Sequence, residues 1–323
     1  MSHLFSALLV LLSVVGCATL PGQSSYSMSV LPLDAAFAIN TSGAIVGRVG
    51  ANAAVYMQGN VVLLPGKEGY SNLTATDIAD NGFIVGSGLS AGNRRGLFWS
   101  STTVAPMDMG ALGSEVSPMS INSQGVAVGF YESPPHLSPK AFRWSLGTGM
   151  TPIAPAATSI SQAFDISETG YVAGLAFYDS IGQQVVRWNL DGSASRVNDG
   201  YADRALRNGS VLGRGSGGST VWTLQGTAIL IGPKPATHVV KQMSAAGRLV
   251  GFTVGEVTSP RAWTTWNSNI PQYLPVPAGA VGSAAVDVNA CGTILGTVKL
   301  SANVEKPVIW SRLTCDVLPP TAK

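Results

Sequence analysis

The chain has 323 residues, of which 46% are hydrophobic and only 11% charged, and its formal net charge is +2. This length is sufficient to bury a large core in a single domain, and the 38 glycines favour an architecture with many tight turns. The small net charge and the lack of any Lys/Arg cluster argue against nucleic acid as a partner.

The first predicted element is an export signal over residues 1–16, followed by a polar tether over residues 17–26. Residues 4–15 form an apolar run that is too short to span a bilayer and has the length of a signal-peptide core. The run ends in Val-Val-Gly-Cys17, which resembles the lipobox of bacterial lipoproteins, where the cysteine is lipidated. Since the first eight residues contain no Lys or Arg, cleavage elsewhere, with Cys17 incidental, remains open.

If Cys17 is lipidated, the protein is attached to a membrane through that residue. Ala18 in the next position resembles lipoproteins sent to the outer membrane. We therefore expect a monomer in the bacterial cell envelope, facing the periplasm or the cell surface.

One pattern recurs seven times between residues 38 and 310, and it is clearest in the third copy, Ser120–Gly129. Each copy has an apolar residue, a turn closed by a glycine, a short apolar run and a second glycine. The mean spacing of about 41.5 residues is close to the ~40–45 residues of a four-stranded propeller blade. The first glycines of the seven copies are Gly43, Gly82, Gly125, Gly170, Gly209, Gly247 and Gly292.

The turn of each copy has a chemical basis. Asn or Ser three residues before the glycine favours a type I turn, and the glycine then takes the left-handed conformation that closes a hairpin. The residues in that place are Asn40, Asn122, Ser167, Ser244 and Asn289. The flanking Val- and Ile-rich segments predict strands, in the third copy over 116–122, 125–131, 141–145 and 150–153.

Each copy also carries an aromatic residue downstream of the turn, which we interpret as a residue that packs between blades. These aromatics are Tyr56, Trp99, Trp144, Trp188, Trp222, Trp266 (or Trp263) and Trp310. The sequence thus predicts an all-β fold, a propeller of seven four-stranded blades closed head to tail over residues 27–323. A solenoid of stacked strands is the alternative.

The third copy also suggests a family. Its Lys140-Ala141-Phe142-Arg143-Trp144 segment, with the Ile-Asn-x-x-Gly element, resembles the bacterial extracellular HAF repeats, although Lys140 replaces their histidine. The resemblance covers roughly residues 38–310. It implies a secreted, β-propeller-like protein and supplies no activity and no catalytic residues.

Two features concern the closure of the ring. A strand over residues 28–33 or one over 316–319 could complete the last blade, and the sequence does not separate them. Cys291 and Cys315 both belong to the seventh copy, and we expect a disulfide between them in an oxidising compartment, with two free thiols as the alternative.

The candidate catalytic groups are few. Asp77, Asp165 and Asp287 occupy the same place in three copies and could face a central channel, as a calcium site or as an acid/base pair. The preferred interpretation is that they either line a hydrated channel or hydrogen-bond a neighbouring blade's backbone. His136 and His238 lie far apart and in no metal-ligand spacing, so neither a metal nor another cofactor is expected.

Recognition is assigned instead to loops on one face of the propeller. The candidate ligand-binding residues are Arg94, Arg95, Tyr131, Glu132, His136, Lys140, Tyr178, Asp179 and Tyr201. The predicted function is a binding or scaffold module for a protein or polysaccharide. The alternatives are a polysaccharide lyase or glycoside hydrolase with its site at the channel mouth, and a purely structural surface protein.

Overall fold

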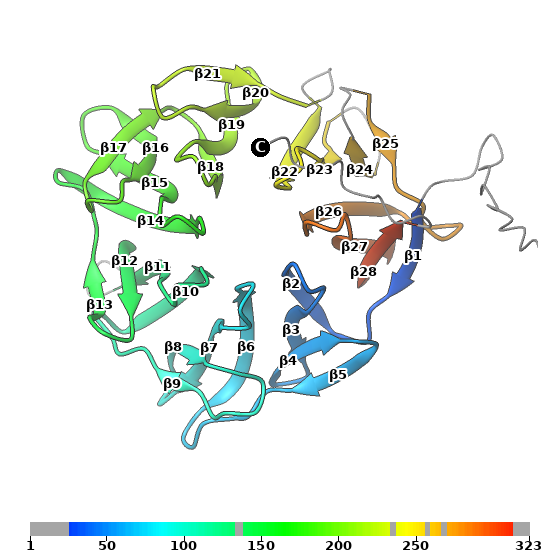
Figure 1. Ribbon diagram of the computed structural model, residues 1–323, viewed down its shortest axis with the longest axis horizontal. Helices are drawn as coiled ribbons and strands as arrows, with labels where there is room; N and C mark the ends of the chain where they lie inside the picture. The colour runs from blue at the N-terminus through cyan, green and yellow to red at the C-terminus, as the bar shows by residue number, and fades with distance from the viewer. Residues whose placement is uncertain (1–25, 133–137, 233–236, 256–258, 266–269, 313–323) are drawn as a thin grey trace, which may run out of the picture.

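A computed structural model describes residues 26–132, 138–232, 237–255, 259–265 and 270–312. In this part of the chain, 28 strands form seven four-stranded antiparallel sheets, which are arranged as blades around a central axis (Figure 1). The prediction of a seven-bladed β-propeller is confirmed. The described part contains no apolar helix of membrane-spanning length.

The strands of each blade follow one another from the axis outward. Blade 1 contains β2 (Ala35–Ile39), β3 (Ile45–Val49), β4 (Asn52–Met57) and β5 (Asn60–Leu63). Blade 2 contains β6 (Ser71–Ile78), β7 (Ile84–Ser90), β8 (Asn93–Trp99) and β9 (Met107–Asp108). Blade 3 contains β10 (Glu115–Ile121), β11 (Ala127–Glu132), β12 (Lys140–Ser145) and β13 (Gly149–Pro152), each within two residues of its predicted bounds. Blade 4 contains β14 (Thr158–Ile166), β15 (Val172–Tyr178), β16 (Gly182–Trp188) and β17 (Ala194–Asn198).

Blades 5 and 6 continue this order. Blade 5 contains β18 (Tyr201–Ala205), β19 (Val211–Gly215), β20 (Gly218–Trp222) and β21 (Ala228–Leu230). Blade 6 contains β22 (His238–Met243), β23 (Leu249–Thr253), β24 (Ala262–Thr265) and β25 (Gln272–Tyr273). Blade 7 takes β26 (Gly282–Val288), β27 (Ile294–Ser301) and β28 (Val304–Arg312) from the C-terminal part and β1 (Tyr26–Val30) from the N-terminal part.

The first glycine of each repeat closes the hairpin between the first two strands. In blade 1, the Gly43 N–H donates to the Asn40 carbonyl at 3.0 Å, and the Asn40 side-chain oxygen accepts from the Ala44 N–H at 2.9 Å. Gly43 has a φ of +84°, which L side chains rarely adopt. This is the predicted turn, a type I turn followed by a left-handed glycine.

The second glycine has a different role, because each inner strand bulges beside it. In blade 4, the pairing shifts between Ala163 and Asp165, and Gly174 lies opposite Ala163. A Cβ on Gly174 would lie 2.0 Å from the carbonyl oxygen of Gln162, so only glycine allows the two backbones to come this close. The same close approach occurs in the other blades at Gly47, Gly86, Gly129, Gly213, Gly251 and Gly296.

The repeat tryptophans pack between blades, as predicted. Trp188 is buried, and its indole N–H donates to the carbonyl of Ile153, in the connection that leaves the preceding blade, at 2.5 Å. Blade 6 departs from the expected register: Leu249 pairs with Thr265, which therefore takes the place of the repeat aromatic. Trp263 lies two residues earlier and is buried, and Trp266 is outside the described residues.

The ring is closed by the N-terminal strand. β1 pairs antiparallel with β28 from Tyr26–Arg312 to Val30–Val308 and forms the outer strand of blade 7 (Figure 1). Of the two predicted closing strands, the N-terminal one thus completes the blade, with bounds shifted from 28–33 to 26–30. Residues 316–319 lie outside the described part.

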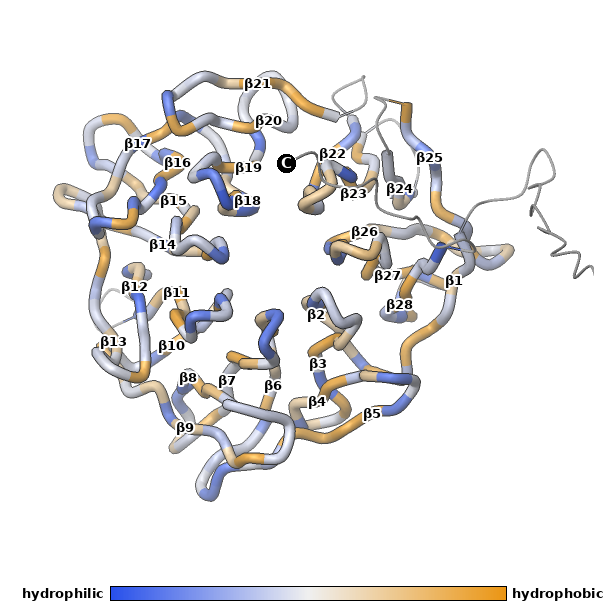
Figure 2. The backbone as a smooth tube through the Cα atoms, viewed as in Figure 1, coloured by the Kyte–Doolittle hydropathy of each residue, from blue (hydrophilic) through white to orange (hydrophobic). Residues whose placement is uncertain are grey.

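The direction of the strands defines two faces. The turns between first and second strands and those between third and fourth strands lie on one face, here called the turn face. The hairpins between second and third strands and the connections between blades lie on the opposite face, here called the loop face. In Figure 2, hydrophilic residues gather at the inner ends of β6, β14 and β18, next to the axis, whereas the interior of the blades is more hydrophobic.

Candidate functional site

The residue that follows each bulge points into the central channel near the turn face. These seven ring residues, in blade order, are Ala38, Asp77, Ser120, Asp165, Arg204, Gln242 and Asp287. They line a depression of about 300 Å³ at the channel mouth. The structure therefore brings the three predicted channel aspartates together on one ring.

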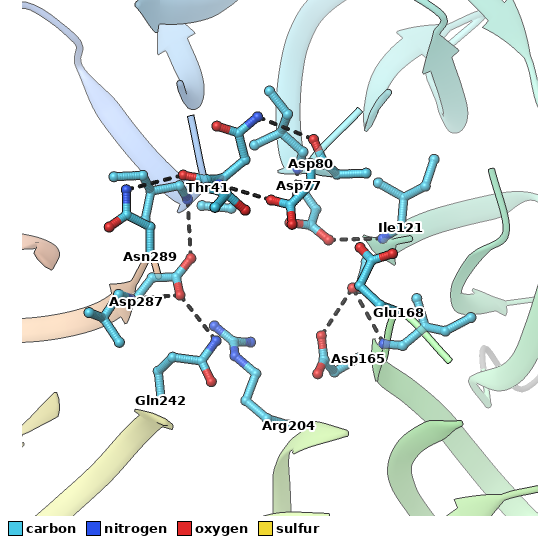
Figure 3. A pocket seen from close by; sticks show the side chains of 18 of the residues that line it. Thr41, Asp77, Asp80, Ile121, Asp165, Glu168, Arg204, Gln242, Asp287 and Asn289 are labelled. Atoms are coloured by element: carbon cyan, nitrogen blue, oxygen red, sulfur yellow. Dashed lines mark hydrogen bonds between the residues drawn. The ribbon is translucent and has the colours of Figure 1, made fainter. Parts of the chain in front are cut away.

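Each ring aspartate binds the backbone of the next blade, as Figure 3 shows for Asp77 and Ile121. Asp77 Oδ2 accepts the N–H of Ile121 at 2.8 Å, and Asp165 Oδ2 accepts the N–H of Ala205 at 2.7 Å. Asp287 Oδ2 accepts the N–H of Ile39 at 3.1 Å, from blade 7 to blade 1. Of the uses considered for these carboxylates, the hydrogen bond to a neighbouring blade is the one observed.

The other oxygens of these carboxylates are also hydrogen-bonded. Asp165 Oδ1 accepts the hydroxyl of Ser120 at 3.0 Å, and Asp287 Oδ1 accepts the amide of Gln242 at 3.1 Å. Asp77 Oδ1 accepts the N–H of Ile78 at 2.9 Å. The ring is thus a network in which the acidic side chains hold adjacent blades together.

Arg204 provides the positive charge of the ring. Its guanidinium points into the channel beside Gln242 and Asp287 (Figure 3). Although burial alone would lower the pKa of Arg204, the negative charges of Asp165, Asp287 and Asp77 raise it. Arg204 therefore stays charged and compensates in part for the three carboxylates.

Burial raises the pKa of Asp77 to about 6, and the charge of Asp165 adds to the effect, while the hydrogen bond from Ile121 opposes it. Burial also raises the pKa of Asp165, against the opposing charge of Arg204. A carboxyl group with a pKa near 6 is a candidate general acid. None of the residues that line this depression in the described part of the chain is a tyrosine or histidine.

The rim of the depression carries further charged groups that sequence reasoning missed: Asp80, Glu168 and Arg207. Asp80 accepts the N–H of Thr41 at 2.8 Å, and Glu168 accepts the N–H of Ser123 at 3.1 Å, so both again join neighbouring turns. Comparing the whole ring position across the seven repeats, rather than only its aspartates, would have identified Arg204 and Gln242.

Those predicted ligand-binding residues that belong to the described part of the chain lie on the loop face, opposite the channel mouth. They do not form one cleft, because they are spread over blades 2 to 5, and most of them lie at strand ends instead of in loops. Tyr131 lies one residue before the end of β11, and Tyr178 ends β15. Both pack partly against hydrophobic clusters, which corrects their predicted loop position. The Lys140 ammonium donates to the Thr158 carbonyl at 2.7 Å and so joins blades 3 and 4.

Two grooves on the loop face follow junctions between blades. The first, between blades 2 and 3, includes Arg94, whose backbone N–H donates to Glu115 at 3.1 Å and whose guanidinium donates to Ser117 at 3.2 Å. Next to it, Arg95 donates to the Gly113 carbonyl at 3.2 Å. The second groove, between blades 5 and 6, includes Tyr201 and Arg214.

The remaining predicted site residues of the described part lie in different parts of the fold, and none of them lines the channel mouth or the two grooves. Glu132 ends β11, and Asp179 follows β15. His238 is buried in β22, where its ring packs 5.7 Å from that of Trp263. Cys291 is exposed in the turn of blade 7. His136, Cys17 and Cys315 lie outside the described residues.

The described residues contain no group of three or more His, Cys, Asp or Glu side chains arranged to hold a metal ion. Residues 213–218 have the pattern Gly-x-Gly-x-x-Gly, which also occurs in dinucleotide sites, but here they join β19 to β20 in a hairpin. It lacks the helix that a dinucleotide site of this kind requires.

No protein-family model matches the chain, and no relative is found among curated sequences. Among solved structures, the chain is similar to puromycin hydrolase, with a TM-score of 0.57 and 12% identity over 86% of this chain and 51% of that one. It is also similar to YCF48 bound to D1 peptide, with a TM-score of 0.55 and 12% identity over 93% of this chain and 98% of that one. The chain thus spans about half the length of puromycin hydrolase, and at these identities the likeness shows the fold alone.

Proposed function

We propose that this protein is an envelope-anchored binding module that uses its loop face to hold a polymer of the cell surface, a polysaccharide in the first place. The observation that carries the proposal is that the ring aspartates are engaged in hydrogen bonds between neighbouring blades. Because Asp77, Asp165 and Asp287 each accept a backbone N–H from the next blade, the channel has a structural role. The grooves at Arg94 and Tyr201 lie on the opposite face, where both side chains are exposed and can contact a ligand.

The path of the N-terminal strand supports this choice of face. Tyr26 pairs with Arg312, where β28 reaches the turn face, so the chain enters the propeller on that face. In our proposal Cys17 carries the lipid, and the nine residues from Cys17 to Tyr26 reach at most roughly 30 Å. An anchored propeller would then turn its channel mouth toward the membrane and its loop face away from it.

The experiment exposes the purified full-length protein to an array of envelope and plant polysaccharides and scores both retention and release of reducing ends. Arg94→Gln on the loop face and Arg207→Gln on the turn face are the matched variants, since both arginines are exposed. We expect retention without release, weakened by R94Q and unaffected by R207Q. Weakening by R207Q alone would reject the loop face, and no retention by the wild-type protein would reject the function.

Membrane attachment is tested separately. Cys17→Ala should move the protein from the membrane fraction to the soluble fraction and abolish the incorporation of labelled fatty acid. A Cys17→Ala protein that stays in the membrane fraction would contradict the anchor.

A second candidate, a polysaccharide lyase or hydrolase at the channel mouth, is favoured by the raised pKa of Asp77. In this case reducing ends would be released, and Asp77→Asn would abolish the release without reducing retention. The lack of release by the wild-type protein on every polysaccharide of the array would exclude this candidate for those substrates.

A further inference from the structure

The second groove of the loop face places an aromatic ring next to a guanidinium. It has a volume of about 480 Å³ and lies between blades 5 and 6. An aromatic ring and a guanidinium form one wall, the serine hydroxyls of the β19–β20 hairpin lie beside them, and Val239 and Val254 of blade 6 form the opposite side.

Tyr201 and Arg214 are direct cross-strand neighbours at the start of β18 and the end of β19. The guanidinium carbon of Arg214 lies 5.4 Å from the centre of the Tyr201 ring, within the range of a cation–π contact. Tyr201 is 52% exposed, so part of its ring is available to a ligand. The pair therefore presents a held guanidinium next to an accessible aromatic surface.

A buried carboxylate holds Arg214 from the channel side. Asp203 is the bulge residue of β18, and its Oδ2 lies 3.6 Å from Arg214 Nε. Its Oδ1 is in contact with the Lys241 ammonium. Two cations thus share the single negative charge of Asp203, so these three side chains together carry a net charge of +1. This positive charge favours an anion.

The backbone around the pair is shaped for close approach. Gly200, which precedes Tyr201, has a φ of +133°, and a Cβ there would lie 2.2 Å from the carbonyl oxygen of Arg214. Gly215 and Gly218 also line the groove, and they add no side chain to it. The floor is therefore largely backbone, with Ser216 beside it, whereas the Ser219 hydroxyl accepts the Val240 N–H at 2.9 Å and joins the two blades.

We propose that this groove binds a uronate residue of an acidic polysaccharide, with the carboxylate on Arg214 and the sugar ring on Tyr201. A guanidinium matches a carboxylate with two parallel hydrogen bonds, and an aromatic face suits the apolar face of a sugar. The inference rests on the proposed binding function of the loop face and names the ligand class for it.

The test uses the purified full-length protein and two probes with the same backbone, polygalacturonate and its methyl ester, in a titration at constant ionic strength. We expect the acid to bind and the neutral ester to bind at least ten-fold more weakly. Equal binding of both probes, or no binding of polygalacturonate, would overturn the proposal that this groove binds a uronate. Retention of neutral polysaccharides alone would leave the binding module intact and reject only this inference.

Variants locate the site. Arg214→Gln should weaken polygalacturonate binding about 10- to 100-fold, the range for a lost charged hydrogen-bonding group. Arg214→Lys keeps the positive charge and should bind more tightly than Arg214→Gln but less tightly than the wild-type protein, because an ammonium cannot make the two parallel hydrogen bonds of a guanidinium. Arg196→Gln, an exposed arginine of β17 outside the groove, is the matched control and should bind as the wild-type protein does.

Since Asp203 keeps Lys241 as a partner, we expect Arg214→Gln to fold, and its melting temperature is measured alongside. Tyr201→Ala changes an exposed side chain and provides a second variant, with an expected loss of about five-fold or more. Equal affinities of the R214Q, Y201A and R196Q proteins would contradict the proposal.

Discussion

The carboxylate of Asp287 in the last blade lies 3.1 Å from the backbone nitrogen of Ile39 in the first blade, 248 residues away. At the same junction the side-chain amide of Asn289 donates to the carbonyl of Asn40 at 3.3 Å. The junction between the last and the first blade is therefore bonded at both the ring position and the turn position of the repeat.

The first prediction concerns this junction. Asp287→Ala removes the acceptor for Ile39 N–H and for the Gln242 amide, both inside the protein. An unsatisfied buried donor costs about 1–3 kcal/mol, so we expect the free energy of unfolding in urea to fall by that amount. Glu68→Ala, at an exposed position, is the control and should change it by less than about 0.5 kcal/mol. Equal stability of the two variants would contradict the structural role of Asp287.

The second prediction concerns the second glycine of the repeat. Gly174→Ala places a Cβ 2.0 Å from a backbone oxygen, which forces the two inner strands of blade 4 apart. We expect a loss of about 3 kcal/mol in the free energy of unfolding. Gly147→Ala is the matched control, because a Cβ there meets no atom within 4 Å and no positive φ is required. If both variants unfold at the same denaturant concentration, the two backbones do not approach each other closely at the bulge of blade 4.

The third prediction is a dependence of stability on pH. Burial raises the pKa of Asp77 from its ordinary value of 3.8 to about 6. The folded state therefore holds this proton more tightly than the unfolded state. The associated stability is present below pH 3.8 and is lost as the pH rises to about 6, at most about 3 kcal/mol.

Melting temperatures of the wild-type protein and of Asp77→Asn between pH 4 and 7 test this dependence. The melting temperature of D77N, relative to that of the wild-type protein, should increase as the pH rises through this range. Parallel curves would show that Asp77 does not titrate in this way.

The fourth prediction concerns closure by β1. Tyr26 is buried, with only 3% of its surface exposed, and its hydroxyl is in contact with Arg248 of blade 6. We expect Tyr26→Ala to cost about 3–5 kcal/mol and Tyr26→Phe, which keeps the ring, about 1–3 kcal/mol. Ser27→Ala, the neighbouring exposed position in the same strand, should be nearly neutral. A Y26A protein as stable as S27A would mean that β1 does not close the ring.

Much of the fold could be predicted because the repeat carries its own local chemistry. Asn40 and Gly43 determine a turn through contacts between residues at most four positions apart, and the same turn recurs in each copy. Strand type follows likewise from the Val- and Ile-rich segments that flank the turn. The number of blades, the strands of blade 3 and the packing role of residues such as Trp188 are consequences of this local pattern.

The candidate sites could be predicted only in part. The shared repeat position of Asp77, Asp165 and Asp287 indicated one ring. Of the two structural roles that the sequence left open, a hydrated channel lining and hydrogen bonds to the next blade, the structure contains the hydrogen bonds. Turn-forming residues follow Tyr131 and Tyr178 within a few positions, and such residues indicate a loop without fixing the last residue of the strand before it. The repeat pattern did not indicate Arg214, because its partner Asp203 occupies the bulge, one position before the ring residue, and not the position shared by the other aspartates.

By itself, the sequence determined the all-β class, the seven repeats and the turns, since each depends on neighbours within one hairpin. Only the tertiary structure decided that β1 rather than a C-terminal strand completes blade 7, and that Thr265 replaces the aromatic of blade 6. It alone decided which charges meet at the channel mouth and beside Arg214. These choices depend on contacts between residues about 40 or more than 200 positions apart, where geometry and burial select among partners that look equivalent along the chain.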